Sequence, residues 1–377
     1  MTTIGDYVLG FYDGPHATPA EAEDGPIFLG IRNVTPDGRL DFSETRHVSA
    51  QEFPRWTKRV KPQRGDVVFS YEATLHRYAL IPEGFDGCLG RRMALIRPDP
   101  EKLDSRFLHF YLLSQDWRNQ VEANVVTGAT VDRVPLTKVP TFNVNFPKLS
   151  YQLRIADILS AYDDLIENNR RRIALLEDAA RQLYKEWFVR LRFPGHEHVK
   201  VIDGVPEGWE KLKLGEVLTL QRGFDLPIGS RLEGAVPVYG STGVVGFHNT
   251  PKVEAPMIIT GRSGSLGRVC FVSIPSWPLN TSLWVREFKR VTPWYAYFLL
   301  SELGLEKFNG GASVPTLDRN VAHAAGVSLP TESLRAVFDE LARATFGMIE
   351  NLKAQIGELA KARDLLLPRL MSGSLAV

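Results

Sequence analysis

Residues 150–191 read SYQLRIADILSAYDDLIENNRRRIALLEDAARQLYKEWFVRL, and this stretch decides the fold. Apolar side chains recur in it at alternating steps of four and three residues, with no proline or glycine between them. This spacing is typical of a coiled-coil seam rather than a surface helix. At a rise of ~1.5 Å per residue it predicts one helix roughly 55 Å long. The seam positions are Ile155, Leu159, Tyr162, Ile166, Asn169, Ile173, Leu176, Ala180, Leu183 and Trp187.

A second copy of the seam lies near the C-terminus. Each of its positions follows its counterpart by 183 residues, as Ile349 follows Ile166, and so regular an offset argues against two unrelated surface helices. A whole domain separates the two helices, so we expect them to pair antiparallel. We also expect the polar seam residues Asn169 and Arg363 to set the register. The second seam consists of Phe338, Ala342, Thr345, Ile349, Leu352, Ile356, Leu359, Arg363, Leu366 and Leu370.

Length and composition set broad limits. The chain has 377 residues, which predicts two domains or more. Its net charge of +1 shows no overall basic excess that would indicate nucleic-acid binding, although a local basic patch would be enough to bind nucleic acid. The two cysteines, Cys88 and Cys270, belong to no CxxC motif, so we expect neither a disulfide framework nor a zinc site. No signal peptide or apolar run of membrane-spanning length is evident, and we expect a cytoplasmic protein.

The chain contains the same unit twice. Short apolar runs punctuated by Gly, Pro and Asp predict strands before each long helix, and a shorter helix is expected at 105–119. The segment MIITGRSGSLGRVCFV of the second block corresponds to VVFSYEATLHRYALIP of the first, and WYAYFLLSEL corresponds to FLHFYLLSQD. A unit this large, present twice, indicates a duplication rather than a solenoid. The predicted parts are a first mixed α/β domain (1–149), a central helix (150–191), a Pro/Gly-rich linker (192–208), a second domain (209–330) and a distal helix (331–377).

Sequence motifs for catalysis are missing. There is no GxxxxGK[ST] phosphate loop, no Rossmann glycine spacing and no Asn-Pro-Pro or Asp-Pro-Pro step of an adenine methyltransferase. Pro98-Asp99 lies too far from Glu287-x-Lys289 for a nuclease of the PD…ExK type. His196 and His198 lack a third ligand nearby, so we interpret them as solvated linker residues rather than a metal site. Catalytic and metal residues are therefore not predicted in this chain.

Several segments suit the recognition of a polar polymer. Residues 55–64 (RWTKRVKPQR) hold five cations and no acid, and such a run can line a phosphate backbone or form a solvated turn. Three consecutive arginines, Arg170, Arg171 and Arg172, can lie on the solvent face of the helix predicted at 150–191, or they can contact a partner subunit or a DNA phosphate. Six loops mix Gly, Ser, Thr and Arg, types that permit close approach and read base edges. These loops are 72–78, 127–133, 221–225, 239–243, 261–268 and 311–319.

Four motifs make nearly the whole chain resemble the specificity subunit of a type I restriction–modification enzyme. They are Gln152–Ile158 (QLRIADI), Gly208–Val217 (GWEKLKLGEV), Thr260–Arg268 (TGRSGSLGR) and Leu365–Gly373 (LLLPRLMSG). The resemblance implies an α+β fold with two similar target-recognition domains separated by two long antiparallel coiled-coil helices. It also implies that each domain reads one half of a split DNA site.

The resemblance further implies partners and cofactors. The helices would recruit two modification subunits that carry S-adenosylmethionine and methylate adenine. Restriction subunits would bring ATP-driven, Mg-dependent translocation and cleavage, and this chain itself would bind no cofactor. Two departures from the family pattern matter. The first block lacks a clear Trp-Glu-x-x-x-Leu opening, so we expect a differently built N-terminal edge. His76 stands where the second block has Gly267, so we expect a differently shaped loop.

The residues expected to contact DNA come from the basic run, from the loops above and from Arg91 and Arg92. In the first domain they are Lys58, Arg59, Lys61, Arg64, Arg77, Arg91, Arg92, Thr130 and Arg133. In the second they are Arg222, Tyr239, Ser241, Arg262, Ser263, Arg268, Ser313 and Arg319. Arg262 is the strongest candidate for reading a base, although pairing with a carboxylate or a phosphate is the alternative. Two rival functions stay open at this point: a self-contained methyltransferase or nuclease, and a coiled-coil adaptor that binds only proteins.

Overall fold

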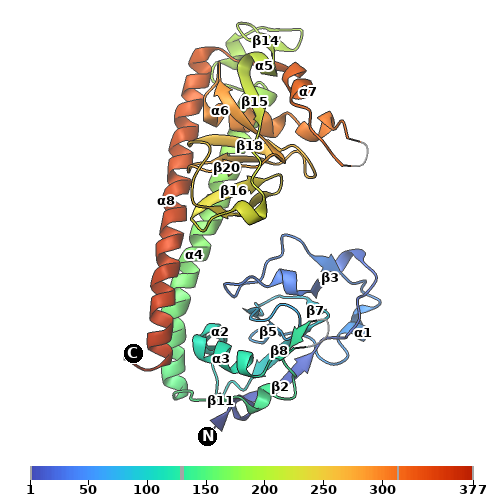
Figure 1. The fold of residues 1–377 in the computed structure, drawn as a ribbon, viewed down its shortest axis with the longest axis vertical. Helices are drawn as coiled ribbons and strands as arrows, with labels where there is room; N and C mark the ends of the chain where they lie inside the picture. The colour runs from blue at the N-terminus through green and yellow to red at the C-terminus, as the bar shows by residue number, and fades with distance from the viewer. Residues whose placement is uncertain (1, 128–130, 312–313, 376–377) are drawn as a thin grey trace. The chain divides into compact units, whose positions relative to one another are not determined.

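The computed structural model divides the chain into two compact units (Figure 1). Each unit contains one sheet-bearing domain and parts of two long helices, α4 and α8. Unit 1 comprises Met1–Asn169 and Ala354–Val377, and unit 2 comprises Arg170–Lys353. The structure describes residues 2–127, 131–311 and 314–375.

The two predicted long helices are present. Helix α4 spans Leu149–Tyr184 and continues into a π-helical turn at Lys185–Val189, while α8 spans Glu332–Met371. Every predicted seam position on both helices is buried or half-buried. Many residues between these positions are exposed, as shown by Leu175 at 70% and Leu365 at 67%, although Ala156 and Tyr184 are also buried. The spacing therefore identified the buried stripe correctly on both helices.

The helices run antiparallel within each unit. In unit 1, Ile155 and Leu159 near the start of α4 share a core with Leu366 and Leu370 near the end of α8. In unit 2 the rings of Tyr184 and Phe338 lie 5.7 Å apart, which places the end of α4 beside the start of α8. Each fully buried Leu, Ile or Phe contributes about 1.5–3 kcal/mol to such a seam.

Polar residues interrupt the seam in unit 1. The Asn169 side chain, 7% exposed, donates from Nδ2 to Gln355 Oε1 at 3.2 Å. The Arg363 guanidinium donates to Asp163 Oδ1 at 2.5 Å. Buried polar pairs specify coiled-coil register because every other alignment leaves them without partners. Both residues that were predicted to set the register, Asn169 and Arg363, therefore make cross-helix hydrogen bonds.

The domain of unit 1 is built on a four-stranded antiparallel sheet in the order β2-β8-β5-β6. Its strands are β2 (Val8–Asp13), β8 (Met93–Pro98), β5 (Val67–Ser70) and β6 (Tyr78–Leu80). Strand β5 is buried on both faces, because Val67 and Phe69 join the core beneath α2 (Ser105–Leu113) while Val68 faces a second core. Successive side chains of a strand point to opposite faces, which is why an unbroken apolar run suits this position.

A smaller sheet and peripheral pairs complete unit 1. The smaller sheet has the order β4-β3-β7, with β3 and β7 parallel. Its strands are β3 (Ala22–Leu29), β4 (Arg46–His47) and β7 (Gly87–Leu89). The two-stranded pairs are β1 (Thr2–Thr3) with β11 (Asn143–Val144) and β9 (Val126–Thr127) with β10 (Asp132–Arg133). The remaining helices are η1 (Ile4–Tyr7), η2 (Ile31–Asn33), α1 (Phe53–Trp56), α3 (Gln115–Ala123) and η3 (Val139–Thr141).

Unit 2 repeats this architecture, which confirms the duplication. Its main sheet has the order β15-β21-β18-β19, and its smaller sheet, β17-β16-β20, again contains one parallel pair. The main strands are β15 (Leu218–Arg222), β21 (Ser282–Phe288), β18 (Met257–Gly261) and β19 (Val269–Val272). The smaller sheet consists of β16 (Val236–Gly240), β17 (Gly243–His248) and β20 (Trp277–Pro278). The two-stranded pairs are β12 (Val201–Ile202) with β13 (Val205–Pro206) and β14 (Glu210–Lys213) with β22 (Gly326–Leu329).

Helices of unit 2 also match those of unit 1. Helix α6 (Pro293–Glu302) occupies the place of α2, and its buried aromatic residues join Tyr184 and Phe338 in one core. The other helices are η5 (His196–His198), α5 (Leu214–Val217), η6 (Ile228–Ser230), η7 (Leu305–Phe308) and α7 (Arg319–Ala324). No helix among the described residues combines the length and apolar character needed to cross a membrane.

Four local expectations need correction. The helix expected at 105–119 is two helices, because Ser114 adopts an extended conformation and its hydroxyl caps α3 by accepting from the Trp117 N–H. The N-terminal edge is a shorter version of the second domain's edge, since β1 pairs β11 as β14 pairs β22.

The linker and the loop at His76 also differ from expectation. The expected linker contains the β12–β13 hairpin, and its Phe193 is 6% exposed, so part of it is packed structure. His76 has φ 61° and Gly267 has φ 87°, so both domains use a left-handed turn at this point. Left-handed φ is uncommon outside glycine. The same backbone shape is therefore kept in spite of the different residue.

Candidate functional site

Loops of the second domain meet at one corner, at the ends of β15 and β18 and just before α7. The backbone of Ser263 forms an isolated bridge with Thr316, and Leu317 N–H donates to the Arg262 carbonyl at 2.8 Å. The turn between β16 and β17 joins the same corner, because Arg268 Nη1 donates to Thr242 O at 2.8 Å. Seven predicted contact residues belong to these strands and loops: Arg222, Tyr239, Ser241, Arg262, Ser263, Arg268 and Arg319.

Glycines give the turn after β18 its shape. A Cβ on Gly261 would lie 1.8 Å from the Ser265 carbonyl oxygen, so only glycine permits that approach. Gly264 and Gly267 both have positive φ. The tight turn expected from the Gly-rich sequence is therefore present, and Arg262 and Ser263 lie at its start.

The predicted residues of this corner differ in exposure. Arg222, Arg268 and Arg319 are exposed, whereas Arg262, Ser263 and Ser241 are half-buried. Tyr239 packs against a small core around Met257 and Ile259, and burial is the main cause that raises the pKa of its hydroxyl. Tyr239 therefore contributes at least partly to packing, while the arginines and serines line the surface.

The corresponding corner of the first domain carries paired charges. Arg92 has φ 69°, and its Nε lies 3.3 Å from Glu72 Oε1. Arg133 of β10 is exposed, and its backbone forms an isolated bridge with Glu72. Arg59 donates to Asp13 Oδ1 at 2.6 Å, at the end of β2. Three predicted residues, Arg59, Arg92 and Arg133, thus lie around the ends of β2 and β5.

Other predicted residues of the first domain lie away from this corner or outside the description. Lys61 pairs with Asp86 at 3.0 Å and Arg64 pairs with Glu83 at 3.0 Å. With Arg59 also paired, three of the five cations in the 55–64 run have carboxylate partners, as the solvated-turn alternative requires. Lys58 and Arg91 are exposed and Arg77 is half-buried, and none of the three forms an ion pair within the described residues. Thr130 and Ser313 lie outside the described residues.

Sequence reasoning missed several polar residues at the second corner. Asn280 accepts from Arg262 Nη1 through its carbonyl at 3.5 Å, and its side chain donates to Asp225. Thr316 and Asn320 line the same cavity as Arg262. A usable signal existed for Asn280 and Thr281, because these two polar residues directly precede the apolar strand β21. Asn280 and Thr281 lie next to Arg262 because strands β18 and β21 pair, and the sequence does not reveal that pairing.

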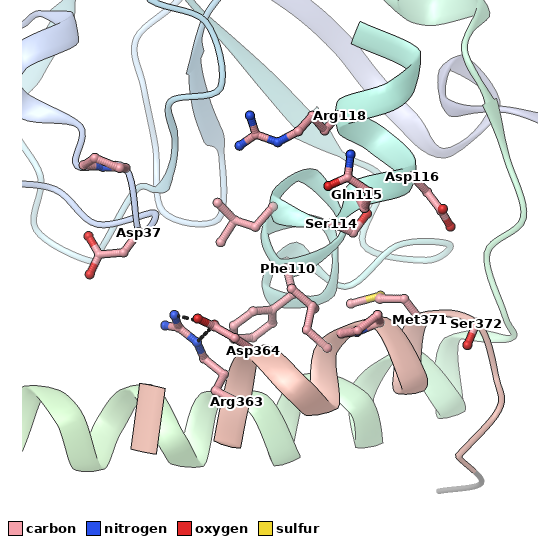
Figure 2. A pocket seen from close by; sticks show the side chains of 14 residues that line it. Asp37, Phe110, Ser114, Gln115, Asp116, Arg118, Arg363, Asp364, Met371 and Ser372 are labelled. Atoms are coloured by element: carbon pink, nitrogen blue, oxygen red, sulfur yellow. Dashed lines mark hydrogen bonds and ion pairs between the residues drawn. The ribbon is translucent and has the colours of Figure 1, made fainter. Parts of the chain in front are cut away.

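A cavity in unit 1 has a different character. It has a volume of about 710 Å³ and lies between α2, α3 and the end of α8 (Figure 2). Phe110, Leu113, Leu367 and Met371 supply apolar lining. Three carboxylates (Asp37, Asp116 and Asp364) and two guanidinium groups (Arg118 and Arg363) also line it. This excess of acid is unsuited to a DNA phosphate.

Nothing in the described part of the chain assembles a metal centre, since no group of three or more His, Cys, Asp and Glu is positioned for one. Cys88 and Cys270 are free thiols. His196 and His198 each lie beside Glu197, and their side chains are 47% and 83% exposed. These histidines are solvated, as their sequence context indicated.

Comparison with known proteins points to one family. The family model of the type I restriction modification DNA specificity domain matches residues 39–178. The type I restriction enzyme MjaIX specificity subunit of Methanocaldococcus jannaschii is 25% identical over 296 residues, which cover 71% of this chain and 68% of that protein. A shorter match, 25% identical over 130 residues, links 34% of this chain to 28% of the type I restriction enzyme HindI specificity subunit of Haemophilus influenzae.

A solved structure supports the same fold. The crystal structure of a type I restriction–modification system S subunit from M. genitalium matches 98% of this chain and 94% of that chain, with a TM-score of 0.55 and 20% identity. That protein shares the fold described here, with its two similar domains and its two long helices. Taken with the duplicated domains, these findings show that the chain is similar to the specificity subunits of type I restriction–modification systems in sequence and in fold.

Proposed function

We propose that this chain is the DNA-recognition subunit and scaffold of a type I restriction–modification complex, and that it reads a two-part DNA site. The observation that carries this proposal is the pair of domains with identical sheet order but different side chains at the corresponding corner. Two domains of the same fold are suited to binding two half-sites. Their different side chains at the corresponding corner are suited to half-sites of different sequence. In this proposal the chain is itself non-catalytic, in line with its similarity to specificity subunits.

Arginine chemistry supports the DNA-binding role. Guanidinium groups supply both phosphate contacts, which give affinity, and base contacts, which give specificity. The second corner carries Arg222, Arg262, Arg268 and Arg319, and the first carries Arg59, Arg92 and Arg133. The chain has a net charge of only +1, and in the first corner Asp13 and Glu72 pair with Arg59 and Arg92, so the surplus of positive charge lies in the second corner.

The long helices offer surfaces for partner subunits. Large apolar side chains outside the seam are exposed on α4 and α8, including Leu165 at 52%, Leu175 at 70%, Met348 at 48% and Leu365 at 67%. These exposed side chains are available for apolar contacts with protein partners. We propose that they contact two modification subunits, and that restriction subunits join the assembly.

Cofactors belong to those partners in this proposal. The modification subunits would carry S-adenosylmethionine, the restriction subunits would use ATP and Mg, and this chain would bind none of them. We also propose a cytoplasmic location, where chromosomal DNA is available.

Sequencing of methylated adenines tests the proposal directly. Cells expressing the complete complex should contain modified adenines in a two-part motif, and deletion of this chain should abolish the modification. DNA binding by the purified chain across a range of salt concentrations separates recognition from a purely protein-binding adaptor. Methyl transfer or DNA cleavage by the purified chain alone would contradict the non-catalytic role.

A further inference from the structure

A cavity at the second domain's corner brings three arginines together. Its volume is about 310 Å³. Arg222 comes from the end of β15, Arg262 from the turn after β18 and Arg319 from the start of α7. Two fully buried apolar side chains, Leu283 at 1% and Leu317 at 0% exposed, also line it. The complete lining is Arg222, Arg262, Leu283, Thr316, Leu317, Asp318, Arg319 and Asn320.

The three guanidinium groups have little local compensation. Arg222 lies 3.7 Å from Asp225, a distance beyond a direct hydrogen bond. Arg262 makes one long hydrogen bond, to the Asn280 carbonyl oxygen, and Arg319 forms no ion pair within the described residues. The single carboxylate in the lining, Asp318, already accepts from the Asn320 N–H at 2.6 Å. The cavity therefore presents a surplus of unused cationic donors.

All three arginines have an ordered backbone, in β15, in the turn after β18 and in α7, but Arg262 is the least exposed of them. Its backbone N–H donates to Thr281 O at 2.9 Å, and its carbonyl accepts from Leu317 N–H at 2.8 Å. The side chain is half-buried, whereas the Arg222 side chain is 51% exposed and Arg319 is also exposed. A donor fork whose base is fixed on both sides is suited to specific bidentate recognition. Exposed arginines are suited to the phosphate backbone.

The first domain places different chemistry at the same positions. Tyr71 there occupies the place of Arg262, because its carbonyl accepts from Val134 N–H at 2.8 Å and its N–H donates to Arg92 O. Asp13, paired with Arg59, stands at the end of β2 where Arg222 stands at the end of β15. The backbone frame is thus shared, and the charge at these two positions is not.

We propose that Arg262 is a specificity-determining residue that binds guanine in one half-site, donating to O6 and N7. Arg222 and Arg319 hold the flanking phosphates. This inference rests on the proposed function, and it assigns a base to the corner of the second domain. Arg262 is half-buried at the turn after β18 and makes only one long hydrogen bond, so its guanidinium fork is available to the two acceptors of a guanine edge.

Binding selection from a pool of duplexes with a randomised central segment tests the assignment. The full chain should enrich a two-part motif with guanine fixed at one position of one half. Arg262→Ala should lose about 10-fold of the preference for guanine at that position and leave the other half unchanged. Arg222→Ala and Arg319→Ala should weaken binding to all sequences and reduce the slope of log affinity against log salt by about one each.

Two controls separate the inference from simpler effects. Arg262→Lys keeps the charge but not the fork, so it should retain the salt slope and lose the guanine preference. Arg286→Ala removes an exposed arginine of β21 that does not line the cavity, and should change neither property. Thermal melting of each variant checks that the second domain remains folded.

The possible failures are distinguishable. If the wild-type chain enriches no motif, the proposed recognition function fails together with this inference. If it enriches a motif and Arg262→Ala keeps the same guanine, the recognition function stands and the assignment of Arg262 is wrong. Equal weakening on all sequences, with a reduced salt slope, would make Arg262 a phosphate contact and would also overturn the assignment.

Discussion

Arg363 of α8 donates a hydrogen bond to Asp163 of α4 at 2.5 Å, inside the seam between the two helices. The Arg363 side chain is 14% exposed and the Asp163 side chain 35%. Arg363 also contacts the exposed Asp364. The pair joins the beginning of one helix to the end of the other, and both residues belong to unit 1. This arrangement predicts how single and double replacements of the pair change the free energy of unfolding.

Breaking this pair should cost stability, whereas replacing both members should not. Arg363→Leu leaves the Asp163 carboxylate without its partner, and we expect the free energy of unfolding to fall by about 1–3 kcal/mol. The double replacement Asp163→Leu/Arg363→Leu should recover most of that loss, because apolar packing substitutes for a partly buried ion pair. Asp364→Ala, at an exposed position, should change stability by about 0.5 kcal/mol or less. Chemical denaturation of the wild type, both single leucine variants and the double variant gives the coupling energy, and additive effects would argue against a specific pair.

A charge placed in the seam of unit 2 should be far more damaging than one beside it. Ile349 is 1% exposed, so Ile349→Asp buries a carboxylate without a partner and should cost several kcal/mol. Met348 is its neighbour in sequence and is 48% exposed, so Met348→Asp should have little effect. Melting temperatures of the two variants provide the comparison. Equal behaviour of the two would show that the seam is not a buried interface.

Exchange of one domain should change one half of the DNA site. A chimera that carries residues 209–330 of a related specificity subunit keeps the first domain and both long helices. We therefore expect a new sequence in one half of the methylated motif, with the other half and the gap unchanged. Sequencing of methylated adenines reads all three features at once. Simultaneous change of both halves would refute independent recognition domains.

The buried His109 should make unit 1 sensitive to acid. Burial is the main cause that lowers the pKa of His109, although Asp163 opposes it, so the folded state binds a proton less readily than the unfolded state. Stability from the neutral ring is thus complete above the unfolded pKa of about 6.5 and falls as the pH drops below it. One proton accounts for up to about 1.4 kcal/mol per pH unit. Urea unfolding of His109→Gln should show a flatter pH dependence than wild type.

A matched histidine provides the control for this measurement. The His198 side chain is 83% exposed, so His198→Gln should leave the pH dependence of unfolding as it is in the wild-type protein. A pH dependence unchanged by His109→Gln would place the acid sensitivity in other groups.

The sequence predicted the repetitive features of this molecule well. The 4-3 spacing identified a stripe of buried or half-buried positions on both helices, although it left out the buried Tyr184. The 183-residue offset identified the duplicated domain, because periodicity and self-similarity are properties of the chain itself. The register between the helices was less accessible. Matching each seam residue to its counterpart 183 residues later would place Ile173 opposite Ile356 or its neighbours. Tyr184 contacts Phe338, and Ile173 lies about three turns before Tyr184 on α4, while Ile349 lies about three turns after Phe338 on α8. This contact therefore places Ile173 opposite Ile349.

The candidate site was predictable in composition but not in assembly. Arg222, Arg262 and Arg319 were each selected from separate loops, and the structure brings them to one cavity. The run around Lys61 and Arg64 was a candidate for phosphate contacts because it contains no acid. Its carboxylate partners, Asp86 and Glu83, come from a later loop, and such long-range pairing has no signal in the local sequence.

The position of Leu370 has a consequence for how the protein is made. This residue, 2% exposed, belongs to the core of the first domain together with Ile155 and Leu159, yet it follows the whole of unit 2 along the chain. A ribosome must therefore translate unit 2 before the first domain can complete its core. Unit 2 is one continuous segment, so its interior is available earlier during synthesis. A premature stop codon in the last turns of α8 would thus damage the first domain, although the strands of that domain are encoded far upstream.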